Sequence, residues 1–263
     1  MRRTHPLIAA IALLTMGFLY LPLLGVAVFS VNAARRGVVW QGFTLDWYLK
    51  LLDNEWILAA AWNTLVLAVV STLVATVLGT ILAIGMDRFP WSKRSATGLD
   101  ILLHIPVVIP DIILAAALVV AFGLLRLLSS IFEPGLFNMI IGHITFQIAF
   151  VALVVRSRLV AIGREVEEAA RDLFADNWYL LRRVMLPLLL PGIVAGGMLA
   201  FTLSLDDFVI SFFTAGPESQ TLPLYIFAAV RRGVTPQIHA LSTLVLLITI
   251  ILVVATERLT RKG

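Results

Sequence analysis

Six apolar stretches, each long enough to cross a lipid bilayer as a helix, dominate this chain. Crossing a hydrocarbon core about 30 Å thick takes roughly 20 helical residues, and the backbone inside lipid must satisfy its own hydrogen bonds. The stretches are about Leu7 to Val31, Ile57 to Met86, Gly98 to Leu125, Asn138 to Val160, Leu188 to Phe213 and Ile238 to Thr256. A seventh run, Leu222 to Val230, is too short to cross and contains Pro223, which indicates a surface or re-entrant segment. The sequence therefore predicts an all-α membrane protein with six transmembrane helices.

Composition agrees with this prediction and excludes several functions. The chain is 60% hydrophobic and 14% charged, whereas soluble domains are about 45 to 50% apolar and about 25% charged. It has no cysteine, its four histidines lie far apart, and it contains no P-loop, H-E-x-x-H or G-x-S-x-G motif. We expect no catalytic residue, no metal, no cofactor and no ATP hydrolysis by this chain itself. Its basic residues flank apolar runs, which indicates topology and not nucleic-acid binding.

The basic residues also predict how the chain is oriented. With a cytoplasmic N-terminus, most of the 20 lysines and arginines fall on the cytoplasmic side, as the positive-inside rule requires. Both termini are then cytoplasmic. A cleaved signal peptide is the alternative for the first stretch, since Arg2 and Arg3 precede it and Val31-Asn32-Ala33 resembles a cleavage site. Its apolar run is longer than the roughly 7 to 15 residues of a signal, so we expect an uncleaved helix.

Three carboxylates within the apolar stretches, Asp111, Asp206 and Asp207, have no lysine or arginine in any span to pair with. A charge at mid-membrane costs about 2.5 to 3.5 kcal/mol on insertion scales. Asp111 has a structural alternative, because Pro106 and Pro110 break the helix before it and an Asp at a new helix start is a natural cap. No proline opens the helix beside the Asp206-Asp207 pair, so a functional role is favoured there.

Helical spacing separates the two acids of this pair. Ser204, Asp207 and Ser211 stand at i, i+3 and i+7 on one stripe, whereas Thr202 and Asp206 lie on a stripe rotated by about 100°. Asp207 also falls towards the outer end of the fifth stretch. The spacing predicts that Asp207 is the carboxylate that meets a cation arriving from outside, and that Asp206 serves packing.

Residues 161–187 form a charged loop between the fourth and fifth stretches. Arg164, Glu167, Glu168, Arg171 and Asp172 give opposite-sign pairs at helical spacing, which predicts a short amphipathic helix at the cytoplasmic surface. A merely solvated loop is the alternative that charge alone leaves open.

Two strings in this loop stand at a family-specific spacing. Glu168-Ala169-Ala170 followed by Val184-Met185-Leu186-Pro187 resembles the E-A-A-x3-G-x9-I-x-L-P signature of ABC importer permeases. The resemblance implies a type I ABC importer permease fold, in which this segment is the coupling helix that docks on an ATPase subunit. The implied coupling residues are Glu168, Ala169, Ala170, Asp172 and Phe174.

Phe174 stands where the family usually has glycine. That glycine permits a left-handed turn, which costs about 1 to 2 kcal/mol for another residue. Either Phe174 keeps a right-handed backbone and Asn177 makes the turn, or its ring is tolerated for contact with the partner.

Further strings resemble the spermidine/putrescine permease subfamily, most of all its second permease subunit. They are Trp40 to Thr44 with Trp47-Tyr48, Pro110-Asp111-Ile112, Gly142 to Phe146, Phe201 to Asp207, Gly216-Pro217 with Leu222-Pro223, and Gly233 to Pro236. The resemblance implies a polyamine path that includes Asp111, Ser204, Asp206, Asp207, Ser211 and Trp47. Asp111 and Asp207 would neutralise the cations, and Trp47 would offer its ring; an interfacial belt tryptophan is the alternative for Trp47.

The function implied is a permease subunit in the bacterial inner membrane that moves polyamines into the cytoplasm by alternating access. It implies as partners a second permease chain, two ATPase subunits and an extracytoplasmic solute-binding protein. We expect residues 1–56 to form the first helix and an extracytoplasmic segment, 57–257 a core of five helices, and 258–263 a cytoplasmic tail. The alternatives are import of another small cationic or organic solute, and a proton-coupled secondary transporter.

Overall fold

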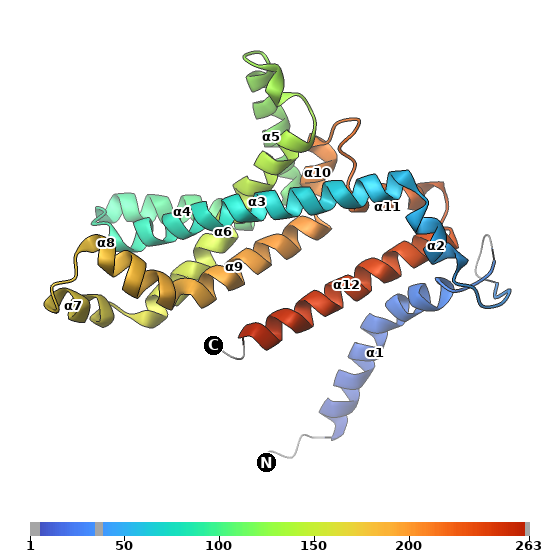
Figure 1. The fold of residues 1–263 in the computed structure, drawn as a ribbon, viewed down its shortest axis with the longest axis horizontal. Helices are drawn as coiled ribbons and strands as arrows, with labels where there is room; N and C mark the ends of the chain where they lie inside the picture. Colours follow the sequence, from blue (N-terminus) through green and yellow to red (C-terminus); the bar gives the residue numbers. More distant parts are fainter. Residues whose placement is uncertain (1–5, 35–38, 261–263) are drawn as a thin grey trace. The chain divides into compact units, whose positions relative to one another are not determined.

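A computed structural model describes residues 6–34 and 39–260, which are almost entirely helical (Figure 1). The chain divides into two compact units, Met1–Leu58 with Tyr225–Glu257, and Ala59–Leu224 with Arg258–Gly263. The only β-type pairing in the described ranges is an isolated antiparallel bridge between Asn32 and Phe43. The predicted all-α class is confirmed.

The first unit contains α1 (Pro6–Phe29), α2 (Asp46–Leu52), most of α11 (Leu222–Arg232) and α12 (Pro236–Thr260). Asn32, fully buried, organises the segment between α1 and α2. Its amide oxygen accepts the N–H groups of Ala34 at 3.2 Å and Gln41 at 2.9 Å, and its amide nitrogen donates to the Val39 carbonyl at 2.9 Å. One side chain thus closes the non-helical segment that follows α1.

The second unit is built around α6 (Leu136–Ile162), which packs against α9 (Leu186–Asp206) and, from Ala59 onward, is flanked by α3 (Glu55–Arg88). Glycines set how closely these helices approach. A Cβ atom on Gly79 of α3 would lie 2.8 Å from Val151 Cβ of α6, and one on Gly192 of α9 would lie 2.8 Å from Arg158 Cβ. Helices in lipid associate through such small residues because close packing, not hydrophobic exclusion of water, holds them together.

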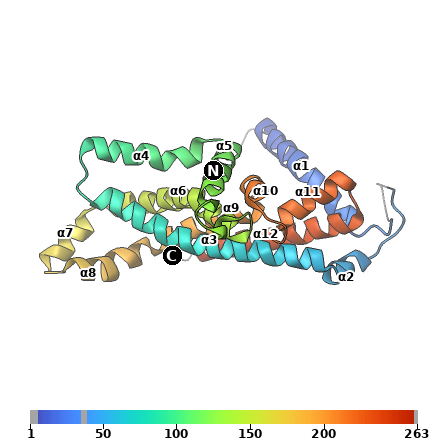
Figure 2. The same cartoon turned by 90° about the horizontal axis from the view of Figure 1, so that it is seen from above.

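Two further groups of helices complete this unit. α4 (Lys93–Val108) packs against α6, is followed by α5 (Asp111–Arg126) after a bend of 106° at Pro110, and η1 (Ser130–Phe132) leads back to α6. α7 (Glu165–Asp172), α8 (Asn177–Tyr179) and the π-helical η2 (Leu180–Met185) follow α6 and run into α9. Both views show α7 and α8 projecting from the end where α3 and α4 are joined (Figures 1 and 2).

Four helical segments are long and apolar enough to cross a membrane by length and composition: Leu7–Phe29, Glu55–Arg88, Leu136–Ile162 and Asn177–Asp206. The bent pair α4 and α5 makes a fifth if it is one broken span. The sixth predicted stretch corresponds to α12, whose apolar part Pro236–Ile251 is shorter. The six-span prediction agrees with these helices, and the short seventh run is the separate helix α11.

One boundary was predicted wrongly. The fifth stretch was expected to be a continuous helix from Leu188 to Phe213, but α9 ends at Asp206 and α10 (Val209–Thr214) begins three residues later. Asp207 between them has φ −61° and ψ 126°, an extended conformation that ends the helix. No proline marks this break; the Asp207 side chain itself stabilises it.

Candidate functional site

Asp207 lies at the joint between α9 and α10 and caps the second helix. Its Oδ2 accepts the N–H of Ser211 at 2.8 Å, and its Oδ1 accepts the N–H of Ile210 at 3.3 Å. The first N–H groups of a helix lack intrahelical partners, so a carboxylate in this place stabilises the start of α10. The Asp207 side chain is only 10% exposed.

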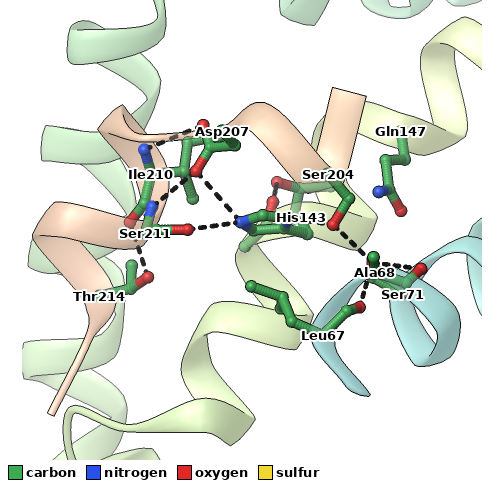
Figure 3. Close-up of polar contacts among 12 residues, drawn as sticks. Leu67, Ala68, Ser71, His143, Gln147, Ser204, Asp207, Ile210, Ser211 and Thr214 are labelled. Carbon is green, nitrogen blue, oxygen red and sulfur yellow. Dashed lines mark hydrogen bonds and ion pairs between the residues drawn. The ribbon is translucent and has the colours of Figure 1, made fainter. Parts of the chain in front are cut away.

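His143, fully buried on α6, completes a polar cluster around this joint (Figure 3). Its Nε2 lies 3.2 Å from Asp207 Oδ2 and 3.1 Å from Ser211 Oγ, and its Nδ1 lies 2.7 Å from Ser204 Oγ. The Ser204 hydroxyl is in turn 3.4 Å from Ser71 Oγ of α3. The cluster therefore joins four helices of the second unit: α3, α6, α9 and α10.

These contacts correct one expectation about Asp207. From the sequence its charge had no partner in the protein, yet His143 and two backbone N–H groups surround its carboxylate. The predicted grouping of Ser204, Asp207 and Ser211 is confirmed, although the three meet at a helix break and not along one straight stripe. Asp206, expected to serve packing, is exposed on the second unit. A place for either acid in a substrate path stays a prediction.

His143 is the residue that sequence reasoning missed. Histidines were considered only as pairs at metal-binding or catalytic spacing, and His143 stands alone. The available signal was a single ionisable group within an apolar stretch, in the string Gly142 to Phe146. Such a residue usually faces the interior of a helix bundle, as it does here. No group of three or more His, Asp or Glu in the described ranges could hold a metal ion.

Asp111 is exposed at the start of α5, where it follows Pro110. Pro110 occupies the cap position and Asp111 is the first helical residue, so the cap interpretation is wrong in its strict form. The partial positive charge of a helix N-terminus still favours a carboxylate there.

Asp111 and Asp206 both border one apolar cluster. Leu114, three residues after Asp111, and Leu203, three residues before Asp206, pack against it. Its buried members come from α5, α6 and α10: Ala115, Leu118, Phe122, Phe146 and Ile210. The two exposed carboxylates, 95 positions apart in the sequence, thus belong to helices that meet in one buried apolar cluster.

Trp47 belongs to the first unit, and its contacts there are largely satisfied. Its indole N–H donates to the Asn32 carbonyl at 2.8 Å, and Lys50 Nζ lies 4.5 Å from the centre of its ring. The Lys50 ammonium already occupies the position that a substrate cation was expected to take. The structure therefore supports an anchoring role for Trp47 and leaves its substrate contact as a prediction.

The short helix expected in the 161–187 loop is present as α7, and its role in coupling stays a prediction. Glu168, Ala169 and Asp172 are exposed, whereas Ala170 is partly buried. Large apolar side chains follow it at the surface, with exposed fractions of 82% for Leu173, 97% for Phe174 and 67% for Trp178. An exposed apolar group of this kind marks an interaction surface.

Phe174 itself adopts the left-handed conformation, with φ 62°. The interpretation in which it stays right-handed and Asn177 makes the turn is wrong. The Phe174 N–H donates to the Arg171 carbonyl at 2.9 Å and the Ala175 N–H to the Ala170 carbonyl at 3.0 Å. This is a Schellman motif, the usual helix C-terminus at a glycine, formed here by a phenylalanine whose ring points into solvent.

Comparison with known proteins identifies the family. Residues 75–262 match the family described as "Binding-protein-dependent transport system inner membrane component". The chain belongs to this family. It is 38% identical over 245 residues to the spermidine/putrescine transport system permease protein PotC of Escherichia coli (strain K12), covering 93% of this chain and 90% of that protein.

Two other proteins are similar to this inner-membrane component in sequence or fold. The putrescine transport system permease protein PotI of Escherichia coli (strain K12) is 38% identical over 237 residues, covering 90% of this chain and 84% of that protein. A bacterial alginate ABC transporter, solved in complex with an alginate pentasaccharide-bound periplasmic protein, has a chain of the same fold. Its TM-score is 0.75 at 20% identity, covering 97% of this chain and 94% of that chain.

Proposed function

We propose that the chain is a transmembrane permease subunit of an ATP-driven ABC importer that carries polyamines, such as putrescine and spermidine, into the cytoplasm. The two polyamine permeases to which it is 38% identical are matched over at least 90% of this chain. The proposal goes beyond the family, whose members carry different solutes.

The observation that carries the polyamine assignment is the pair of exposed carboxylates, Asp111 and Asp206, on helices that share one buried apolar cluster. A polyamine is a flexible methylene chain with ammonium groups, so it needs more than one anion along its path. A carboxylate exposed in a membrane-embedded segment must face an aqueous path, a partner helix or a cation, since lipid contact is costly. Both acids are therefore assigned to the substrate path, with Asp207 holding the joint beside them.

The proposed transporter needs partner subunits because this chain contains no ATP-binding motif. We assign it a second permease subunit, two ATP-binding cassette subunits and an extracytoplasmic polyamine-binding protein. The alginate transporter of the same fold, solved with a periplasmic protein, supports the last of these. The exposed face of α7 with Phe174 supports docking of an ATPase subunit. The basic flanks support a cytoplasmic location for both termini and an inner-membrane setting.

The test is transport by the complete complex in proteoliposomes. Uptake of radiolabelled putrescine and spermidine is measured with the loaded binding protein outside and ATP inside, and again with a non-hydrolysable ATP analogue. Uptake that needs ATP hydrolysis and survives a protonophore supports the proposal. Uptake that a proton gradient drives without ATP would favour a secondary transporter.

Import of another small cationic or organic solute is the second candidate. In such a system the substrate specificity resides mainly in the binding protein. Competition by unlabelled solutes in the same uptake assay therefore distinguishes polyamine import from import of another solute. Failure of excess spermidine and putrescine to compete with the solute that co-purifies with the complex would overturn the polyamine assignment.

A further inference from the structure

We infer that His143 is a positioning residue for transport: it fixes the joint between α9 and α10, and thereby the place of Asp206 in the substrate path. This inference rests on the proposed function and extends it to a buried residue outside the substrate path.

The backbone leaves the helical conformation at the joint between α9 and α10. Asp207 is extended, so the helical hydrogen-bond ladder is interrupted between Asp206 and Val209. What holds α10 at this point is the Asp207 carboxylate, which accepts the N–H groups of Ile210 and Ser211. The Asp207 side chain thus connects the start of α10 to the end of α9, and groups that hold this side chain help to fix the joint.

His143 is placed to do this from outside both helices. An ionised carboxylate only accepts hydrogen bonds, so His143 Nε2 must carry the hydrogen that points to Asp207 Oδ2 at 3.2 Å. The other ring nitrogen, Nδ1, is hydrogen-bonded to the Ser204 hydroxyl at 2.7 Å, since a hydroxyl can donate or accept. The His143 ring therefore contacts α9 through Nδ1 and the joint through Nε2.

The packing beside the ring holds α10 at this distance. A Cβ atom on Gly142 would lie 3.0 Å from Ile210 Cγ2 and 3.4 Å from a Leu118 methyl group, so α10 approaches α6 closely next to His143. His143 is 0% and Ser204 2% exposed. A buried ring with both nitrogens satisfied has little freedom to move, which makes it a fixed reference point on α6.

Asp206 follows from this arrangement. It is the last residue of α9 and is exposed. Ser204 two residues before it and Asp207 directly after it both contact His143, so the histidine fixes the last turn of α9 that carries this carboxylate. Loss of the histidine leaves Asp207 buried with one donor fewer and frees the joint to rearrange. Asp206 would then lose its fixed place, while α7 and the ATPase surface at the other end of the unit would be unaffected.

Isosteric replacements separate the two nitrogens. The amide nitrogen of His143→Gln can take the place of Nε2 and reach Asp207, whereas that of His143→Asn takes the place of Nδ1 and reaches only Ser204. Polyamine taken up per ATP hydrolysed is measured for both variants and for His143→Ala, in complexes purified to equal content of all subunits. We expect His143→Gln to keep most of this ratio, and Asn and Ala to lower it about tenfold, as for one lost charge-assisted hydrogen bond. ATP hydrolysis stimulated by the loaded binding protein should persist in all three.

Three results would overturn the positioning role: an equal ratio of uptake to ATP hydrolysis in the Gln and Asn variants, a wild-type ratio in His143→Ala, or a parallel fall of uptake and ATP hydrolysis.

A second measurement is independent of the substrate. The chain has no cysteine, so the Asp206→Cys variant can be labelled with a cationic thiol reagent and the mass of this chain followed. The labelling rate should change severalfold with His143→Ala and little with His143→Gln. Thr202→Cys, exposed one turn earlier on α9, is the matched control and should label equally in every background.

These two measurements distinguish the inference from the proposed function. If the wild-type complex carries no polyamine but labelling of the Asp206→Cys variant responds to His143→Ala, the proposed function fails and the joint stands. If polyamine is carried and the labelling rate at position 206 ignores the histidine, the joint assignment fails alone.

Discussion

Arg88, the last residue of α3, and Glu167 of α7 form an ion pair, with Nε 2.5 Å from Oε1. Both side chains are largely buried, at 15% and 14% exposed. Arg164 adds a second contact, since its Nη2 donates to the Asp87 carbonyl at 3.0 Å. The proposed ATPase-docking helix is therefore fastened to the end of α3 as well as continuing towards α9. A movement of α7 would reach two helices of the unit directly.

The first prediction tests this fastening by charge exchange. Arg88 also pairs with Asp87, so Arg88→Glu places three carboxylates together in a site with little water, and removing a partner from a buried pair costs about 3 to 5 kcal/mol. We expect ATP hydrolysis to continue with greatly reduced uptake. The double variant Arg88→Glu, Glu167→Arg restores opposite charges and should recover uptake in part. Uptake and ATP hydrolysis are compared at equal amounts of assembled complex. Uptake by the double variant that does not exceed that of Arg88→Glu would contradict the link between α3 and α7.

The second prediction concerns the left-handed Phe174. Phe174→Gly removes backbone strain of about 1 kcal/mol and should raise the unfolding midpoint of the solubilised complex. Phe174→Ala is the matched control, because it removes the ring but keeps a residue with a Cβ atom in the left-handed conformation. Both should weaken ATPase docking in a pull-down assay. A midpoint equal in Gly and Ala variants would refute the strain, and unchanged docking in both would remove the ring from the interface.

The third prediction reverses the roles that sequence spacing gave to Asp206 and Asp207. Asp206→Asn and Asp111→Asn should each lower the initial rate of polyamine uptake about tenfold at normal complex levels, as expected for one lost charged contact. Asp207→Asn should mainly lower the amount of assembled complex, because an amide meets His143 and the N–H groups of α10 less well. Asp53→Asn, an exposed acid at the end of α2, controls for general charge loss. If only Asp207→Asn abolished uptake, and the complex still assembled normally, then Asp207 and not Asp206 would be the carboxylate that meets the substrate cation.

The fourth prediction tests the close helix packing. Gly79→Ala adds a Cβ atom 2.8 Å from Val151 Cβ and 2.9 Å from the Ile148 carbonyl oxygen, so α3 and α6 must separate, at a cost of about 1 to 3 kcal/mol. Gly85→Ala lies on the same helix with nothing within 4 Å of the added atom, and should be neutral or slightly stabilising. The unfolding midpoints of the two complexes are compared. Equal midpoints would show that α3 and α6 do not touch as described.

Local signals in the sequence predicted most of the helices. Apolar runs marked the spans, Pro110 marked the bend before Asp111, and alternating charges marked α7. Each of these depends on neighbours within a few turns, which periodicity and composition record. The exchange of roles between Asp206 and Asp207 could not be found in this way, because a continuous helix was assumed through Asp207.

The order of residues alone established a helical membrane protein with a permease signature, since span length, charge placement and the Glu168 to Pro187 spacing are properties of the linear chain. The packing of distant helices was needed to show which acid is buried and which is exposed. His143 and Asp207 are 64 positions apart in the sequence. The packing of α6 against α9 and α10 brings the histidine within hydrogen-bonding distance of the Asp207 carboxylate and so gives this carboxylate a partner. That distance follows from Gly142, Gly192 and Gly196, where missing side chains let the helices approach and no local pattern records which helix they meet.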